Sequence, residues 1–169
     1  MCYEKAVNLK SKLIFFSIKD ILEEEIGFSK LVWLLSKSEK LMIGHNMLTD
    51  IMQILRQFFS SPLPENYEDF KSMTNSLFPK ILDTKYMANI APLKELINTS
   101  VLGDMDKLLD KDPFVSSLTV ECNQYSTKNE KLHEAGYDAF ITGLCYLRML
   151  NYLKKFNSSK NLIDSYLNK

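Results

Sequence analysis

The stretch that decides the fold runs from residue 40 to residue 59 and reads KLMIGHNMLTDIMQILRQFF. Its first six residues, 40–45, are a short apolar run that ends in glycine and histidine, which is typical of a buried strand. Asn46 can then cap a helix, because apolar residues follow it at helical spacing to about residue 59. A strand that leads directly into a helix is a unit of α/β folds.

The flanking segments continue this alternation of helix and strand. Residues 80–83 predict a second short strand, and residues 113–131 predict a long surface loop because they show no sustained period. The sequence pattern favours helices in five further segments: 20–37, 67–77, 92–98, 105–110 and 134–156. We therefore expect a single α/β domain.

Composition limits the class of protein. The 169 residues are 46% hydrophobic and 25% charged, as in ordinary globular domains. The 21 basic residues equal the 21 acidic ones, which argues against a nucleic-acid binder held by bulk positive charge, but not against a local basic groove. Three distant cysteines fit neither a disulfide framework nor a zinc site. With no membrane-length apolar run and no signal peptide, we expect an intracellular protein.

The first group of candidate functional residues is His45, Asn46 and Asp50, at the change from strand to helix. Ligand sites of α/β sheets favour the carboxyl ends of strands, and Asp50 lies about one turn into the predicted helix. Its carboxylate could therefore face a cleft. The alternative is structural, since Asn46 can be a cap and Asp50 an acid favoured by the helix dipole.

The second group is His133 and Asp138, at the start of the last predicted helix. A loop histidine can accept a proton near neutral pH, and a carboxylate on the helix below it can hold a divalent metal. The alternative is a capping segment before a core helix. Two carboxylates on separate elements and one histidine suit a two-metal phosphodiester site, with Mg²⁺ or Mn²⁺ favoured over zinc.

Three ordered blocks resemble the poly(A)-specific ribonuclease family: residues 42–59 with GHN and a following aspartate, 77–87 (LFPKILDTKYM) and 132–150 (LHEAGYDAFITGLCYLRML). The resemblance covers residues 28–151. It implies the RNase H-like fold of the CAF1-type DEDD exonucleases. It also implies a 3′→5′ exoribonuclease that acts on 3′-hydroxyl RNA ends, shortening poly(A) tails or trimming small RNAs and releasing 5′-nucleotides.

The resemblance also implies roles for single residues. Asp50 and Asp138 match metal-binding acids of the family, and His133 matches the histidine that deprotonates the attacking water, as in the histidine subtype. His45 and Asn46 belong to the segment beside the bound 3′-terminal nucleotide, and Lys85 is a further expected RNA contact.

The family's first motif, an Asp-x-Glu on an early strand that supplies two more metal-binding acids, has no counterpart in this sequence. We therefore expect a fold that is incomplete at its N-terminal antiparallel strands. The expected boundaries are an uncertain lead-in at 1–19, the C-terminal part of a nuclease domain at 20–156 and a tail at 157–169. The alternative is an inactive remnant that binds RNA or pairs with a second copy or a complete nuclease subunit.

Overall fold

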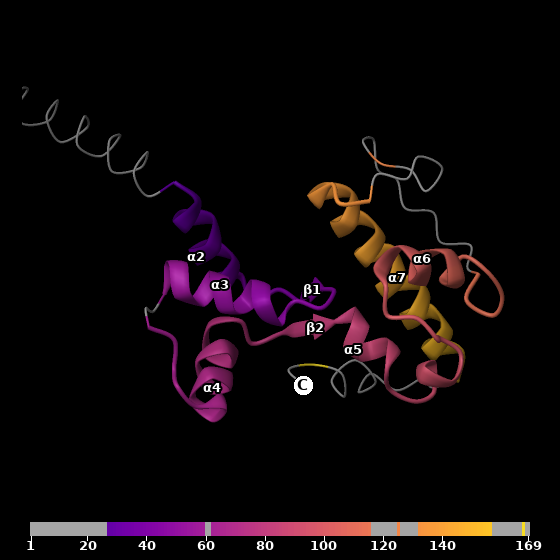
Figure 1. The fold of residues 1–169 in the computed structure, drawn as a ribbon, viewed down its shortest axis with the longest axis horizontal. Helices are drawn as coiled ribbons and strands as arrows, with labels where there is room; N and C mark the ends of the chain where they lie inside the picture. The colour runs from indigo at the N-terminus through magenta and orange to yellow at the C-terminus, as the bar shows by residue number, and fades with distance from the viewer. Residues whose placement is uncertain (1–26, 60–61, 116–124, 126–131, 157–166, 168–169) are drawn as a thin grey trace, which may run out of the picture. The chain divides into compact units, whose positions relative to one another are not determined.

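The computed structural model describes residues 27–59, 62–115, 125, 132–156 and 167 (Figure 1). Contacts divide the chain into two units, 1–38 and 39–169, and each is described by itself. The described part of the first unit contains helix α2 (Phe28–Ser38), which follows Gly27 at φ 46°. It lies in the predicted helix of 20–37, whose first residues are outside the described part. The predicted domain boundaries stay predictions.

The second unit contains a parallel pair of short strands. Strand β1 (Met42–Gly44) pairs with β2 (Ile81–Asp83), and Gly44 lies opposite Asp83. Both strands lie within their predicted ranges. Helices α3 (Leu48–Phe58) and α4 (Tyr67–Leu77) form the connection between them (Figure 1). Parallel strands need such a crossover, so the predicted α/β organisation is confirmed. The sheet of the described residues has two strands.

Four elements follow β2: α5 (Thr84–Ala88), the 3-10 turn η1 (Leu93–Glu95), α6 (Leu102–Leu109) and α7 (Ala135–Phe156). The prediction for 134–156 is confirmed almost to the residue. The helix expected at 92–98 is only one 3-10 turn, and the helix expected at 105–110 begins earlier. Helix α5 was not predicted, because five residues are too few to show a period. Most of the expected loop of 113–131 lies outside the described residues.

The core of the second unit forms where α7 packs against α6, α5 and β1 (Figure 1). Leu93, Met105, Leu109 and Met149 are fully buried in it, and such burial of apolar surface is the main source of stability. Burial also raises the pKa of the Cys145 thiol to about 12, with a smaller contribution from the Asp106 carboxylate. Among the described residues, no helix is long and apolar enough to cross a membrane.

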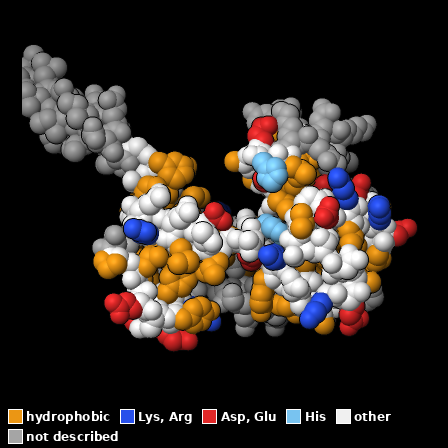
Figure 2. All heavy atoms as spheres, in the orientation of Figure 1, with side chains coloured by type: hydrophobic (Ala, Val, Ile, Leu, Met, Phe, Trp, Pro, Cys, Tyr) orange, Lys and Arg blue, Asp and Glu red, His pale blue; other side chains and the backbone are white. Residues whose placement is uncertain are grey.

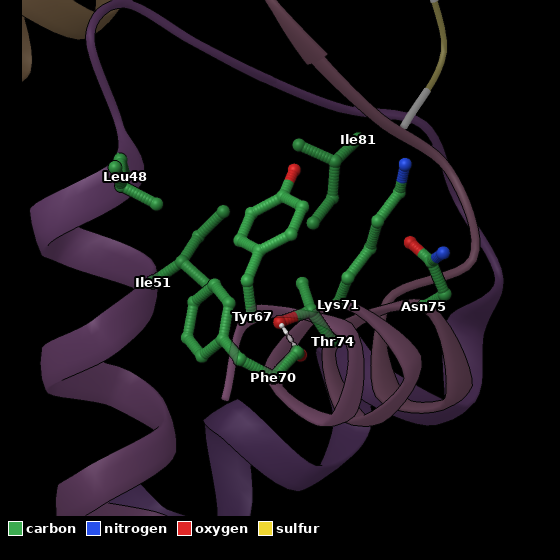
Figure 3. A pocket seen from close by; sticks show the side chains of 8 residues that line it. All are labelled: Leu48, Ile51, Tyr67, Phe70, Lys71, Thr74, Asn75 and Ile81. Atoms are coloured by element: carbon green, nitrogen blue, oxygen red, sulfur yellow. Dashed lines mark hydrogen bonds between the residues drawn. The ribbon is translucent and has the colours of Figure 1, made fainter. Parts of the chain in front are cut away.

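Apolar side chains also gather at the surface over α3 and α4 (Figure 2). A pocket of about 100 Å³ opens there between α3, α4 and β2. Figure 3 shows the rings of Tyr67 and Phe70 beside Ile51, with Lys71 and Asn75 on the other side. The lining is mainly apolar and includes none of the predicted metal-binding acids, so this pocket is not the predicted site.

Candidate functional site

The candidate site begins where β1 and β2 end. The two strands are parallel, and Gly44 is in register with Asp83, so the turns that follow them lie at one edge of the sheet. The turn after β1 carries His45 and Asn46, and the first turn of α5, which follows β2, carries Thr84 and Lys85. This is the edge at which ligands bind in α/β sheets.

The carboxylate of Asp83 joins the two turns. Its Oδ1 accepts hydrogen bonds from the backbone N–H groups of Asn46 at 3.0 Å, Lys85 at 2.8 Å and Tyr86 at 3.3 Å. Its Oδ2 accepts from the N–H of Met47 at 2.9 Å. Asp83 is thus the N-cap of α5 and also binds the start of the segment that leads into α3. A carboxylate that accepts several N–H groups forms charge-assisted bonds, which are stronger than neutral ones.

The prediction that Asn46 caps the following helix is wrong. The N-cap of α3 is Met47, and no side-chain cap bond is present. The physical reason is the backbone of Asn46, which has φ 57° and directs its N–H toward Asp83. Asparagine tolerates this left-handed conformation better than most residues. The side chain turns instead to Lys85, whose Nζ donates to Asn46 Oδ1 at 3.4 Å.

Both ring nitrogens of His45 lie within hydrogen-bond distance of other residues of the chain. Its Nε2 lies 3.1 Å from the carbonyl oxygen of Ser100, and its Nδ1 lies 3.0 Å from Thr84 Oγ1. The Thr84 hydroxyl also donates to the carbonyl of Gly44 at 2.9 Å. Burial lowers the pKa of His45, opposed by the Ser100 bond and the Asp83 charge. Both ring nitrogens of His45 therefore serve to fix the turn.

Asp50 lies in the first turn of α3, as predicted. Its side chain is exposed, and within the described part of the chain it forms no hydrogen bond or ion pair. The first turn of a helix favours an acid through the helix dipole. An exposed carboxylate in that position is free to take a cation as a ligand.

His133 and Asp138 meet at the start of α7. The backbone N–H of His133 donates to Oδ1 of Asp138 at 3.3 Å, and Asp138 lies in the first turn of the helix. His133 has φ 71°, a conformation that is strained for a residue with a β-carbon. Asn46 and His133 are therefore two of the three non-glycine residues with positive φ in the described ranges. Such strain is concentrated at functional sites.

Tyr125 lies outside α7 and contacts the first residues of that helix. Its hydroxyl donates to Glu134 Oε1 at 2.8 Å, and its ring lies against those of Tyr137 and Phe140. A side chain at position 136 would overlap the Tyr125 hydroxyl, which explains the glycine there. Tyr125, a residue of the predicted 113–131 loop, therefore contacts the helix start where His133 and Asp138 meet.

Asp50 and Asp138 have the right chemistry for a metal site, but two acids are too few to complete one. Carboxylate oxygens are the ligands that Mg²⁺ and Mn²⁺ prefer. Among the residues that the structure describes, however, no group of three or more histidine, cysteine or acidic side chains could hold a metal ion. Asp50 and Asp138 alone therefore do not form a complete metal site, and the predicted metal stays a prediction.

The structure brings the predicted residues together in two clusters. Asn46 and Lys85 meet at the strand ends with His45 nearby, and His133 meets Asp138 at α7. The sequence contains two histidines, and both are visible on the face drawn in Figure 2. Sequence reasoning missed Asp83 as the centre of the first cluster. The available signal was its place at the end of a predicted strand, at the edge where ligands bind.

Comparison with known proteins gives the context for these residues. The sequence matches the family described as "CAF1 family ribonuclease" over residues 4–146. It is 44% identical to "Poly(A)-specific ribonuclease PARN" of Danio rerio and 42% identical to that of Homo sapiens, each over 88% of this chain. It is 31% identical to "Poly(A)-specific ribonuclease PNLDC1" of Homo sapiens over 80% of this chain.

These alignments cover only part of the relatives. The matched region is 24% of the Danio rerio protein, 25% of the human poly(A)-specific ribonuclease PARN and 27% of human PNLDC1. The chain thus spans about a quarter of the length of the relatives it matches.

Proposed function

Since the chain belongs to the CAF1 family of ribonucleases, whose fold is RNase H-like, we propose that it forms part of a 3′→5′ exoribonuclease that acts on 3′-hydroxyl ends of RNA. The observation that carries this proposal is its identity of 42–44% with proteins named poly(A)-specific ribonucleases, over 88% of the chain. The proposed substrates are poly(A) tails or the 3′ ends of small-RNA precursors.

The proposed reaction is hydrolysis of the terminal phosphodiester bond. Water attacks the phosphorus, the bond to the 3′ oxygen of the preceding nucleotide breaks, and a 5′-nucleotide leaves the shortened RNA with a new 3′-hydroxyl. His133 is the proposed acceptor of the proton from that water, a role that suits a histidine at neutral pH. Its exposure and its backbone contact with Asp138 support this assignment.

Asp50 and Asp138 are the proposed ligands of Mg²⁺ or Mn²⁺, and such ions supply charge stabilisation and an activated water in phosphodiester hydrolysis. No Asp-x-Glu occurs anywhere in the sequence, and the described residues lack a complete metal site. We therefore propose that the remaining acids come from outside this sequence, on the same or a partner polypeptide.

Digestion of a 5′-labelled oligoadenylate with a 3′-hydroxyl end tests the proposal. The chain is assayed with Mg²⁺, alone and joined to a family segment that carries an Asp-x-Glu. We expect stepwise 3′ shortening from the joined protein and its loss in Asp138→Asn. The matched control is Asp104→Asn, an exposed acid in the first turn of α6, which keeps activity. Absence of shortening from the joined protein, or full activity of Asp138→Asn, contradicts the proposal.

A second candidate function is a non-catalytic domain that binds RNA or pairs with a complete nuclease subunit. The absence of an Asp-x-Glu from the sequence favours it. The two candidates differ in their response to metal, because a binding domain retains its affinity for oligoadenylate without Mg²⁺. The two candidates also predict different results for the joined protein, which stays inactive if the second candidate is correct.

A further inference from the structure

One acid at the strand ends has no role in the reaction proposed above. Asp83 is partly buried, and it is the last residue of β2. Its two oxygens accept four backbone N–H groups, two from the turn after β1 and two from the first turn of α5. A single cap of α5 needs only the contacts within its own turn, which are those with Lys85 and Tyr86. The other two bonds reach across the sheet.

Two of the four bonds go to residues expected beside the RNA end, one across the sheet and one within α5. Asn46 is bonded through its N–H to Asp83 Oδ1, and Lys85 is bonded through its N–H to the same oxygen. Their side chains then meet, with Lys85 Nζ donating to Asn46 Oδ1 at 3.4 Å. This orientation leaves the Asn46 amide N–H groups as donors toward a ligand oxygen, beside one positive charge.

The left-handed backbone of Asn46 depends on the same acid. At φ 57° the residue is outside the conformations that its neighbours in the strand and helix adopt. The hydrogen bonds of the Asn46 and Met47 N–H groups with Asp83 oppose the return of this turn to an ordinary conformation. Thr84 supports the same arrangement through its bond with the Gly44 carbonyl.

We propose that Asp83 is a positioning residue, which holds Asn46 and Lys85 in the geometry that recognises the 3′-terminal nucleotide of RNA. The inference rests on the proposed function, since it assumes that RNA binds at this edge. Asp83 does not touch the RNA and does not hold metal. Its carboxylate acts through the two backbone turns.

Asp83→Asn tests the proposal with little change in shape. Asparagine has one acceptor oxygen in place of two, so at least one of the four N–H groups faces an NH₂ group and loses its bond. The matched control is Asp104→Asn, an exposed acid in the first turn of α6. The readout is the ratio of two dissociation constants, for 5′-labelled oligoadenylates that end in a 3′-hydroxyl or in a 3′-phosphate. Fluorescence anisotropy measures both.

We expect the native chain and Asp104→Asn to prefer the 3′-hydroxyl end, and Asp83→Asn to lose about tenfold of that preference while still folded. A merely structural role lowers both affinities equally and leaves the ratio unchanged, which overturns the proposal while the proposed function stands. If the native chain binds neither oligonucleotide, the same comparison is made in the joined protein, and a joined protein that binds neither overturns both.

Backbone amide NMR gives a second test that needs no RNA. The N–H groups of Asn46, Met47, Lys85 and Tyr86 all bond to one carboxylate. We expect their signals to shift in Asp83→Asn and to stay in place in Asp104→Asn. Unchanged signals in Asp83→Asn overturn the positioning role independently of any ribonuclease activity.

Discussion

The backbone N–H of His133 donates to Oδ1 of Asp138 at 3.3 Å, which ties the predicted proton acceptor to a predicted metal-binding acid. The contact spans the last residues of a loop and the first turn of a long helix. The Asp138 carboxylate therefore belongs to a rigid helix, whereas His133 has a strained backbone conformation. Its proximity to Asp138 suits a base that acts on a water near a cation.

The first prediction concerns the strain at His133. Because its φ is 71°, glycine fits the position better than any residue with a β-carbon. We expect His133→Gly to have an unfolding free energy about 1 kcal/mol higher than that of His133→Ala. Urea denaturation measures both variants. Equal values would mean that the positive φ is not maintained in solution. Both variants lose the ribonuclease activity of the joined protein if His133 is the base.

The second prediction concerns the pH dependence of stability at His45. Burial lowers the pKa of this histidine below its ordinary value of 6.5 in the folded chain. As the pH falls through 6.5, the unfolded chain takes up a proton that the folded chain does not, so the unfolding free energy decreases. We expect His45→Gln to show a smaller loss of stability between about pH 8 and about pH 5 than the native chain.

NMR titration of the two histidine rings checks the same point directly. The His45 signal is expected to titrate with a midpoint below 6.5. A midpoint at or above that value contradicts the burial of the ring between Thr84 and Ser100.

The sequence predicts the strands and the long helix because each has a strong local signal. The apolar run of 40–45 and the stripe of 134–156 are visible without any knowledge of neighbours. The junctions depend on distant partners, and there the prediction fails. Asn46 looks like a cap, but its N–H bonds with an acid 37 residues later in the chain. No local pattern reveals such a pairing.

The predicted site shows the same limit. Asp50 and Asp138 are found in first helical turns, as their positions in the sequence suggest. Asp83 ends a strand of three residues and precedes a helix of five, so it resembles an ordinary turn residue. Only the parallel register that places it opposite Gly44 brings it to the turn that holds Asn46.

The third prediction concerns the ion pairs that join α6 to α7. Arg148 bonds with Asp106, where both side chains are nearly buried at 12% and 13% exposure, and with Asp110, which is 67% exposed. We expect Arg148→Ala to lower the unfolding free energy by about 1–3 kcal/mol, because it leaves a buried acid without this partner. Asp110→Ala is the matched control, with an expected loss of about 0–1 kcal/mol. Similar losses in the two variants contradict this account.

The fourth prediction concerns Cys145 on α7. Its thiol is fully buried and has a pKa of about 12, so the reactive thiolate is scarce at mildly alkaline pH. We expect iodoacetamide to leave Cys145 unmodified in the folded chain and to modify it after denaturation. Peptide mass spectrometry distinguishes it from the other two cysteines. Rapid modification of the folded chain contradicts the packing of α7 against α6.

The central claim is that Asp50 on α3 and Asp138 on α7 are ligands of one divalent-metal site. The most direct test is a Mn²⁺ titration of the ¹⁵N-labelled chain, because the paramagnetic ion broadens amide signals near the place where it binds. We predict weak binding that broadens the signals around both acids at the same Mn²⁺ concentration. Asp138→Asn is expected to remove both effects, and Asp104→Asn to retain them. Broadening around one acid alone, or broadening near Asp50 that survives in Asp138→Asn, contradicts the claim.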